Sequence, residues 1–298
     1  MDPMKMENEK KDLLEERLEL DGSNESEYFQ LIDEILGHSD GQNCFQMLKD
    51  EVQFHEMHHQ GGLIPRLIAV QGSITDGVSP IYRHPTDHLL EAVSWTPMVN
   101  KIRNQLQKSL NQDFNHCLIQ YYRGGHDFIS EHSDKTIDIV PNTNIVNFSA
   151  GATRTMVLRT KKGYTPSNTR EKHTFQLSNN SAFVLTGKGN ATFLHSIKQD
   201  KRMESLKSPE EIAFNGERIS LTFRTIGTFS FYEDGVMKIY GQGATSKDKI
   251  NAKLVNNSSE QVIAMLKAFS KENHEFDFDR NLFYGVGFDS THCTENTI

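Results

Sequence analysis

The sequence predicts an α+β protein with a double-stranded β-helix (jelly-roll) core, N-terminal helices and a C-terminal helical extension. Two observations support this fold class. Apolar residues recur at helical spacing upstream of residue 111 and again near 258–270. Between these regions, from Asn115 onward, short apolar runs alternate with polar and glycine-containing turns, a pattern typical of barrels and jelly rolls.

The N-terminal third combines a charged leader with helices and one strand-rich segment. Residues 1–25 are rich in charge and are expected to be flexible. Helical spacing of apolar residues over 28–58 predicts two short helices that are separated at Gly41. Residues 63–83 are typical of strand and turn, and 86–111 of a further helix.

The predicted core strands are runs of four to nine residues rich in β-branched and aromatic side chains. An amphipathic helix is expected near 258–270, and the aromatic residues that follow it are expected to pack on the core. The strand runs are 117–122, 145–150, 155–160, 173–178, 181–186, 193–197 and 218–226.

Composition excludes several classes of protein. No apolar run of about 18 residues is present, which argues against a membrane span. The charged N-terminus lacks the apolar stretch of a secretory signal. The three cysteines, Cys44, Cys117 and Cys293, are too few and too far apart for a disulfide framework or a cysteine zinc site. An intracellular location, nuclear or cytoplasmic, is therefore expected.

The net charge of −8 bears on the class of partner. A protein that grips many phosphates is usually basic, at least locally, so this balance argues against extensive contact with nucleic acid. A local basic patch acting alone remains open.

Three side chains form a candidate iron site. His132 and Asp134 are two residues apart, so on a strand they would project from one face. His195 lies on a later predicted strand, which a jelly roll can bring opposite the first pair. Two histidines and one carboxylate are the facial triad of non-haem Fe(II) oxygenases, which leaves coordination positions open. The H-x-D pair alone arises easily by chance in a chain with 13 histidines.

The run RISLTFR at 218–224 is a candidate carboxylate anchor. Its polar residues Arg218, Ser220, Thr222 and Arg224 would share one face of a strand. Two arginines that face inward need anions, and a dicarboxylate supplies two. The alternative is an outward face with both arginines in solvent.

These motifs, in this order, resemble the AlkB family of Fe(II)/2-oxoglutarate oxygenases, which carries H-x-D, a distal His and then R-x-N-x-x-x-R. The segment LIQYYRGGHDFISEHSD is similar to the family's approach to its iron ligands, with Tyr122 and Gly125 matching. The resemblance runs from about residue 44 to 229. It departs from the family at Gln120 and Ser220, which stand where the family has Asn, and at Gln71, where repair members often have an aromatic residue.

The resemblance implies the cofactors and their contacts. It implies that Fe(II), 2-oxoglutarate and O2 are used and that succinate and CO2 are released while a substrate C–H is hydroxylated. The iron ligands would be His132, Asp134 and His195. The 2-oxoglutarate contacts would be Tyr122, Gln120, Arg218 at the distal carboxylate, Ser220, and Arg224 near the C1 carboxylate.

The substrate implied by the resemblance is an N-alkylated base in DNA or RNA, as in DNA repair. Lid residues Arg66, Gln71, Tyr82 and Arg83 are the expected substrate contacts. One alternative is a small metabolite or a protein side chain, for example of a histone, which the acidic charge and Gln71 favour. Another is a non-catalytic jelly-roll binding protein. Candidate phosphate contacts are Arg159, Lys161, Lys162, Lys198, Lys201 and Arg202.

The resemblance also predicts how the chain is divided. The oxygenase domain would span 26–240, with a lid at about 62–85 and the jelly-roll core at about 115–230. An insertion at 198–217 and an extension at 241–298, packed on the core or partly flexible, would be additions.

Overall fold

A computed structural model describes residues 25–59, 62–164 and 169–291 of the chain. The leader predicted at 1–25 lies outside these residues except for Glu25, and Cys293 also lies outside them. The described cysteines, Cys44 and Cys117, are buried free thiols, as expected from their spacing.

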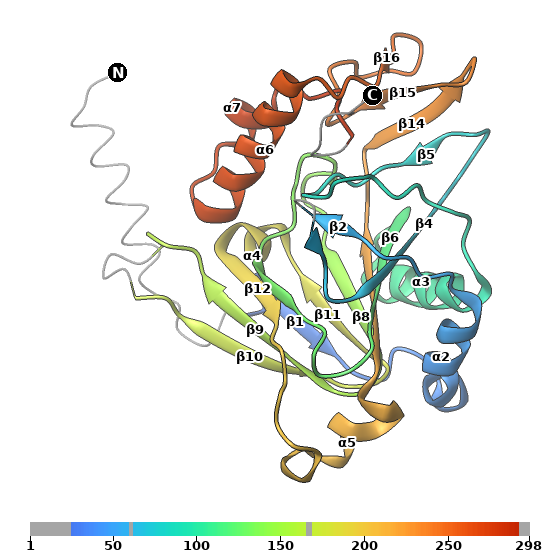
Figure 1. The fold of residues 1–298 in the computed structure, drawn as a ribbon, viewed down its shortest axis with the longest axis vertical. Helices are drawn as coiled ribbons and strands as arrows, with labels where there is room; N and C mark the ends of the chain where they lie inside the picture. The colour runs from blue at the N-terminus through green and yellow to red at the C-terminus, as the bar shows by residue number, and fades with distance from the viewer. Residues whose placement is uncertain (1–24, 60–61, 165–168, 292–298) are drawn as a thin grey trace.

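Two antiparallel sheets form the core, in the jelly-roll arrangement that the sequence predicts (Figure 1). The larger sheet has the strand order β1 (Phe29–Ile32), β11 (Ser181–Leu185), β8 (Ile145–Gly151), β13 (Arg218–Arg224), β6 (His116–Tyr122) and β4 (Leu67–Gly72). The smaller sheet has the order β10 (Lys172–Leu177), β9 (Arg154–Thr160), β12 (Phe193–Ile197) and β7 (Ile129–His132).

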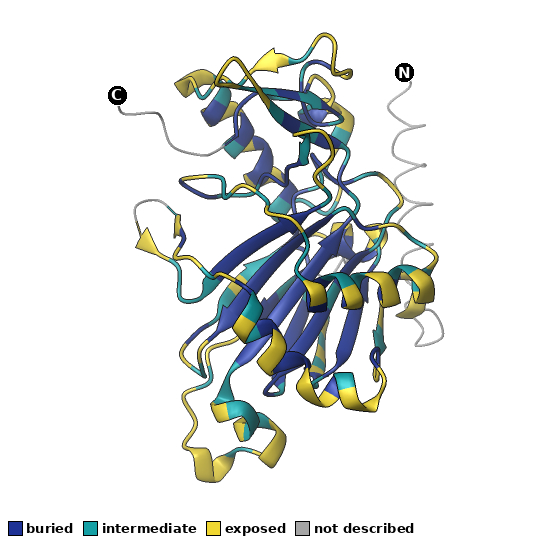
Figure 2. Cartoon of the chain, turned by 90° about the vertical axis from the view of Figure 1, so that its right-hand side faces the viewer, coloured by how far each residue is buried: buried dark blue, intermediate teal, exposed yellow. Residues whose placement is uncertain are grey.

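Helices α2 (His38–Glu51) and α3 (Pro97–Leu110) cover the outer face of the larger sheet. Figure 2 shows them in front of the buried strands, with their exposed sides turned outward. On β13, Ile219, Leu221 and Phe223 face these helices within one apolar core. Side chains alternate along a strand, so the polar set of β13 must face the space between the two sheets.

The prediction of two helices over 28–58 is wrong. Residues Phe29–Ile32 form edge strand β1, which pairs with β11, and Phe29 packs on other aromatic rings. Gly41 does not separate two helices but lies inside α2. A Cβ there would come within 2.4 Å of the Asn180 side chain, so the position requires the close approach that only glycine permits.

The helix predicted over 86–111 occupies only the second half of that range. Helix α3 begins at Pro97, a favoured first helical residue. The preceding residues are held in extended form, because the Val93 amide donates to Val70 and the Val93 carbonyl accepts from Gly72. Backbone pairing with β4 therefore overrides the apolar spacing.

The chain after the core adds a third sheet and two helices. Sheet order is β16 (Lys253–Leu254), β15 (Val236–Gly241), β14 (Thr228–Glu233) and β5 (Ser79–Pro80), so the lid shares this sheet with the extension. Helix α6 (Ser259–His274) confirms the predicted C-terminal helix, and α7 (Arg280–Tyr284) follows it. Met265, Phe269 and Tyr284 pack on Ile137 of the core.

Short elements complete the described chain. No described helix has the length and apolar character needed to cross a membrane. The insertion predicted at 198–217 contains η2 (Glu204–Leu206), α5 (Pro209–Ile212) and η3 (Ala213–Gly216). The remaining elements are η1 (Glu25–Glu27), β2 (His58–His59), β3 (Gly62–Leu63) and α4 (Gly187–Thr192).

Candidate functional site

His132, Asp134 and His195 meet at one end of the smaller sheet. His132 closes β7 and lies directly opposite His195 on β12. The Nε2 atoms of the two imidazoles are each 3.9 Å from Oδ1 of Asp134. One ligand atom from each residue lies within 4.8 Å of the others, the only such group found among the described residues. The donor set and its spacing fit a divalent metal of the Fe(II) type.

The local reason for this geometry differs from the one that the sequence suggests. Strand β7 ends at His132, so Asp134 is not on the same strand. The Asp134 amide instead donates to Oδ1 of Asn190 on α4, whose Nδ2 returns a hydrogen bond to the Asp134 carbonyl, both at 2.9 Å. This reciprocal pair fixes the backbone that carries the carboxylate.

Charge is balanced around the triad by Arg224. Its Nε and Nη2 donate to Oδ2 of Asp134 at 3.0 and 2.6 Å. Burial alone would raise the pKa of Asp134, but the Arg224 guanidinium holds that pKa well below its usual range. Burial lowers the pKa values of His132 and His195. The triad is therefore two neutral imidazoles and one carboxylate, the protonation state in which these groups bind metal.

Arg218 lies on the inner face of the larger sheet and is 1% exposed. Its Nη2 donates to Asn147 Oδ1 and Ser149 Oγ, at 3.0 and 2.8 Å. Its Nε and Nη1 are buried and have no hydrogen-bond partner among the described residues. Burial lowers the Arg218 pKa only to about 10, so the group remains a cation at neutral pH. Two buried, unpaired donors on one guanidinium fit a carboxylate that binds with both oxygens.

This geometry decides whether the arginines of the RISLTFR run face inward or face solvent. The arginines face inward, and solvent does not reach them. The dicarboxylate prediction therefore fits the structure, because the inner face of the larger sheet presents a cation with free donors at Arg218 and a second cation at Arg224.

The other predicted co-substrate residues line the same face. Tyr122 pairs with Arg218 across β6 and β13, and the Arg218 guanidinium carbon is 5.4 Å from the Tyr122 ring centroid. Ser220 pairs with Gln120, and both are buried. The Ser220 hydroxyl accepts from Asn147 Nδ2 at 2.7 Å, which leaves its own proton available for donation.

Asn147 is a site residue that the sequence analysis missed. It bridges Arg218 through its oxygen and Ser220 through its nitrogen. A signal was present, because Asn147 and Ser149 alternate with apolar residues along β8 and therefore share the inner face.

Arg66 and Tyr82 are the lid residues that approach the site. Arg66 Nε donates to Gln120 Oε1 at 2.5 Å. The Tyr82 ring contacts two planar groups: the Arg224 guanidinium carbon is 3.9 Å from its centroid, and the His84 ring stacks at 5.4 Å. Tyr82 thus covers the cation that orients Asp134.

Arg83 and Gln71 do not reach the site. Arg83 is fully buried, and its guanidinium is bound by Asp138 and by the carbonyls of Phe288 and Ser290. Gln71 is on the face of β4 that packs against α3, where its side chain bonds Thr96. Both side chains are occupied by partners inside the fold, Arg83 by Asp138 and Gln71 by Thr96.

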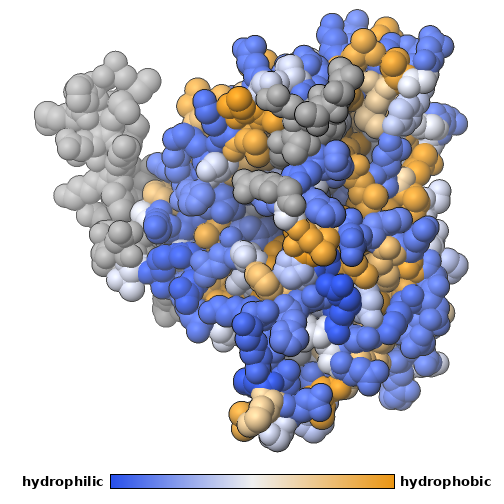
Figure 3. Space-filling model, viewed as in Figure 1, coloured by the Kyte–Doolittle hydropathy of each residue, from blue (hydrophilic) through white to orange (hydrophobic). Residues whose placement is uncertain are grey.

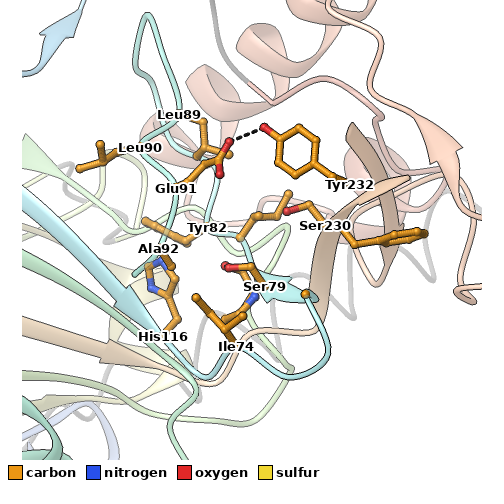
Figure 4. Close-up of a pocket in the computed structure, with 14 residues that line it drawn as sticks. Ile74, Ser79, Tyr82, Leu89, Leu90, Glu91, Ala92, His116, Ser230 and Tyr232 are labelled. Atoms are coloured by element: carbon orange, nitrogen blue, oxygen red, sulfur yellow. Dashed lines mark hydrogen bonds between the residues drawn. The ribbon is translucent and has the colours of Figure 1, made fainter. Parts of the chain in front are cut away.

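A cavity of about 180 Å³ adjoins the site between the lid and β14 (Figure 4). Tyr82 and His116 form part of its wall, and Glu91 accepts a hydrogen bond from the Tyr232 hydroxyl across it. Ligand pockets are usually about 300 Å³ or larger, so this space is small for a ligand. It lies where the lid packs against β14.

Several predicted phosphate contacts are engaged within the protein. Arg159 lies 3.3 Å from Glu131, Arg202 pairs with Asp200 and Glu211, and the buried Lys161 donates to the Glu272 carbonyl. Lys162, Lys198 and Lys201 are exposed. The face in Figure 3 mixes hydrophilic and hydrophobic side chains.

Comparison with known proteins gives a consistent family. A profile of the 2OG-Fe(II) oxygenase superfamily matches residues 29–224. DNA oxidative demethylase ALKBH2 of Mus musculus is 26% identical over 201 residues, which cover 64% of this chain and 77% of that protein. Alpha-ketoglutarate-dependent dioxygenase alkB homolog 3 of Homo sapiens is 26% identical over 168 residues. These cover 54% of this chain and 52% of that relative, about half its length.

Proposed function

Because this chain belongs to the 2OG-Fe(II) oxygenase superfamily, we propose that it oxidatively demethylates N-alkylated bases in DNA or RNA. The enzyme class follows from the family and its relatives: the chain is an AlkB-like Fe(II)- and 2-oxoglutarate-dependent dioxygenase. A non-catalytic jelly-roll protein is therefore the wrong alternative. The substrate class rests on the likeness to ALKBH2, which is named a DNA oxidative demethylase.

The observation that carries the proposal is the pairing of the triad with a buried, half-paired Arg218. We assign His132, Asp134 and His195 as the iron ligands. Arg224 keeps Asp134 ionised and aims its carboxylate. With iron and 2-oxoglutarate bound, O2 converts 2-oxoglutarate to succinate and CO2 and one oxygen atom enters a substrate C–H bond. An N-methyl group would become N-hydroxymethyl, which leaves as formaldehyde.

The inner face of the larger sheet would bind 2-oxoglutarate. Arg218 would meet the distal carboxylate with its two unpaired N–H groups. Tyr122, Gln120 and Ser220 would donate hydrogen bonds along the same face. Gln120 replaces the family's Asn but has its oxygen held by Arg66, so its amide is already oriented.

The lid would hold the substrate base beside the iron. Tyr82 is the aromatic residue nearest the site on the lid, since it stacks on Arg224. The exposed Lys198 and Lys201 are candidate contacts to nucleic acid. Arg66 is a candidate contact to the base, although its guanidinium also donates to Gln120 and to the Phe128 carbonyl. Such substrates lie in the nucleus or cytoplasm, which is where the proposal places the protein.

A second candidate substrate is a small metabolite or a protein side chain. The observation in its favour is that Arg159, Lys161 and Arg202 are bound to internal acceptors. The net charge of −8 also opposes an extended phosphate contact.

The test is turnover with and without a methylated oligonucleotide. We expect the Fe(II)-loaded enzyme to release succinate with 2-oxoglutarate and O2, and His132→Ala to release none. Formaldehyde that appears in step with succinate would support demethylation. Succinate without formaldehyde, together with oligonucleotide binding that does not weaken as salt is raised, would favour the second substrate class. No succinate from the wild type would contradict the assigned site.

A further inference from the structure

The backbone amides that follow His132 are bound by side chains from distant parts of the chain. We call residues 133–136, which include Asp134, the ligand loop. Each of its four amides donates to a side-chain oxygen rather than to a neighbouring strand. The pairs are Ser133 to Asn273 (2.9 Å), Asp134 to Asn190 (2.9 Å), Lys135 to Tyr82 (3.1 Å) and Thr136 to Glu272 (2.9 Å).

Two of the four acceptors lie in the last turn of α6, in the C-terminal extension. Glu272 is 4% exposed, although carboxyl groups are rarely buried without partners. It accepts from the Thr136 amide and, at 2.5 Å, from the Thr136 hydroxyl. The Tyr284 hydroxyl donates to its other oxygen at 2.6 Å. The hydrogen bonds of the Glu272 carboxyl thus go to the ligand loop and to α7.

Asn273 makes the second attachment. Its Oδ1 accepts from the Ser133 amide and from Lys135 Nζ at 3.1 Å. Lys135 also donates to the Ser133 carbonyl, and Lys161 donates to the Glu272 carbonyl. Two buried ammonium groups therefore meet the C-terminal end of α6, where the helix dipole favours positive charge.

The need for these contacts follows from where β7 ends. Past His132 no strand supplies acceptors for the loop, and a buried amide without a partner is costly. Without α6, the Ser133 and Thr136 amides would lose their acceptors on either side of Asp134. The loop backbone would then be bound only by Asn190 and Tyr82, and the Asp134 carboxylate only by Arg224.

We propose that Glu272 and Asn273 are positioning residues of the iron site, acting through the ligand loop to hold Asp134 in its ligand geometry. The inference rests on the proposed iron site. The proposed role adds to the iron site a part of the chain that lies beyond residue 224, where the family match ends. The extension is thus a component of the metal centre.

The test is Mn(II) affinity, measured by calorimetric titration of the full chain without 2-oxoglutarate. Partners that orient metal ligands are usually worth roughly 10- to 100-fold in affinity, so Glu272→Ala should bind Mn(II) at least ~10-fold more weakly. Glu272→Gln keeps an oxygen for the Thr136 amide and should recover most of the affinity. Asn273→Ala should weaken binding, and Asn273→Asp should restore it.

Tyr284→Phe is the matched control. It removes a hydrogen bond to the same carboxyl group but spares the ligand loop, so it should lower stability and leave Mn(II) affinity unchanged. Amide hydrogen exchange of the metal-free protein should quicken at 133–136 in Glu272→Ala and not in Tyr284→Phe.

The possible failures are distinct. A wild-type chain that does not bind Mn(II) would overturn the proposed iron site. A wild type that binds Mn(II), with Glu272→Ala and Asn273→Ala equally tight, would overturn the positioning role. If Glu272→Ala does not fold, the comparison of Asn273→Ala with Asn273→Asp tests the positioning role in the same way. Asn273 is less buried than Glu272, so these variants should fold.

Discussion

Arg224 binds Asp134 through two nitrogens, and the two side chains are almost completely buried. Removing one partner of a buried ion pair typically costs about 3–5 kcal/mol, because the other charge stays buried and uncompensated. Arg224→Met should therefore lower the unfolding free energy of the metal-free protein by roughly that amount. Saturating Mn(II) should restore part of the loss by neutralising Asp134. Chemical denaturation with and without Mn(II) measures both effects, and an equal loss in the two conditions would contradict the assignment.

Arg218→Met should weaken 2-oxoglutarate binding without weakening Mn(II) binding. The variant loses the two unpaired donors, and truncating one partner of a buried charged pair commonly costs about 2–5 kcal/mol, so the affinity should fall by at least roughly 30-fold. Calorimetric titration of 2-oxoglutarate into the Mn(II)-loaded protein gives the affinity. Arg202→Met, on an exposed cation, is the control and should leave it unchanged. An unaltered 2-oxoglutarate affinity in Arg218→Met would remove this residue from the site.

Arg83→Met should reduce stability and spare substrate affinity. The Arg83–Asp138 pair is fully buried, and the guanidinium also binds two carbonyls of the extension. Loss of the arginine should cost about 3–5 kcal/mol. Denaturation of Arg83→Met, Asp138→Asn and the double variant measures the coupling. A changed KM for substrate at unchanged stability would return Arg83 to the substrate contacts.

His84 should make the fold sensitive to acid. Burial lowers the folded-state pKa of His84 to about 4, from an ordinary value of 6.5. Between these two values the unfolded chain binds a proton that the folded chain does not, so stability falls as the pH drops from 6.5 to 4. At about 1.36 kcal/mol per pKa unit, the contribution is roughly 3 kcal/mol.

His84→Phe tests this contribution, because it keeps an aromatic ring against Tyr82 but does not titrate. As the pH is lowered from 6.5 to 4, the unfolding free energy of the wild type should fall more than that of His84→Phe. Parallel stability curves for the two proteins would show that another group is responsible.

The arginine strand could be predicted because its chemistry follows from short-range spacing. The iron ligands could be predicted from the order of the family motifs and not from a shared strand, since β7 ends at His132. On β13, alternation alone separates Arg218 and Arg224 from the apolar residues between them. Gly41 and β1 could not be predicted this way, since a tight contact with Asn180 and pairing with β11 decide them. The helix predicted from residue 86 was wrong over 86–96 for a similar reason, because backbone pairing with β4 holds this segment in extended form.

The role of the C-terminal helix was beyond any local pattern. Glu272 resembles an ordinary surface glutamate of an amphipathic helix, and its partner Thr136 is 136 residues earlier in the chain. Arg83 was misread similarly, because a charged residue beside a lid tyrosine gives no sign that its partner is Asp138. Contacts of long sequence separation set both environments.

The attachment of the ligand loop to α6 also sets an order of events during synthesis. Ser133 precedes its acceptor Asn273 by 140 residues. At about 5–20 residues per second, a ribosome takes on the order of ten seconds to cover that distance. After His195 has been translated and before Glu272 and Asn273 follow, the triad is complete in the chain but its loop lacks two of its four acceptors. On the proposed role of Glu272 and Asn273, the ligand loop reaches its final geometry only after α6 has been translated, so tight metal binding should follow the synthesis of that helix.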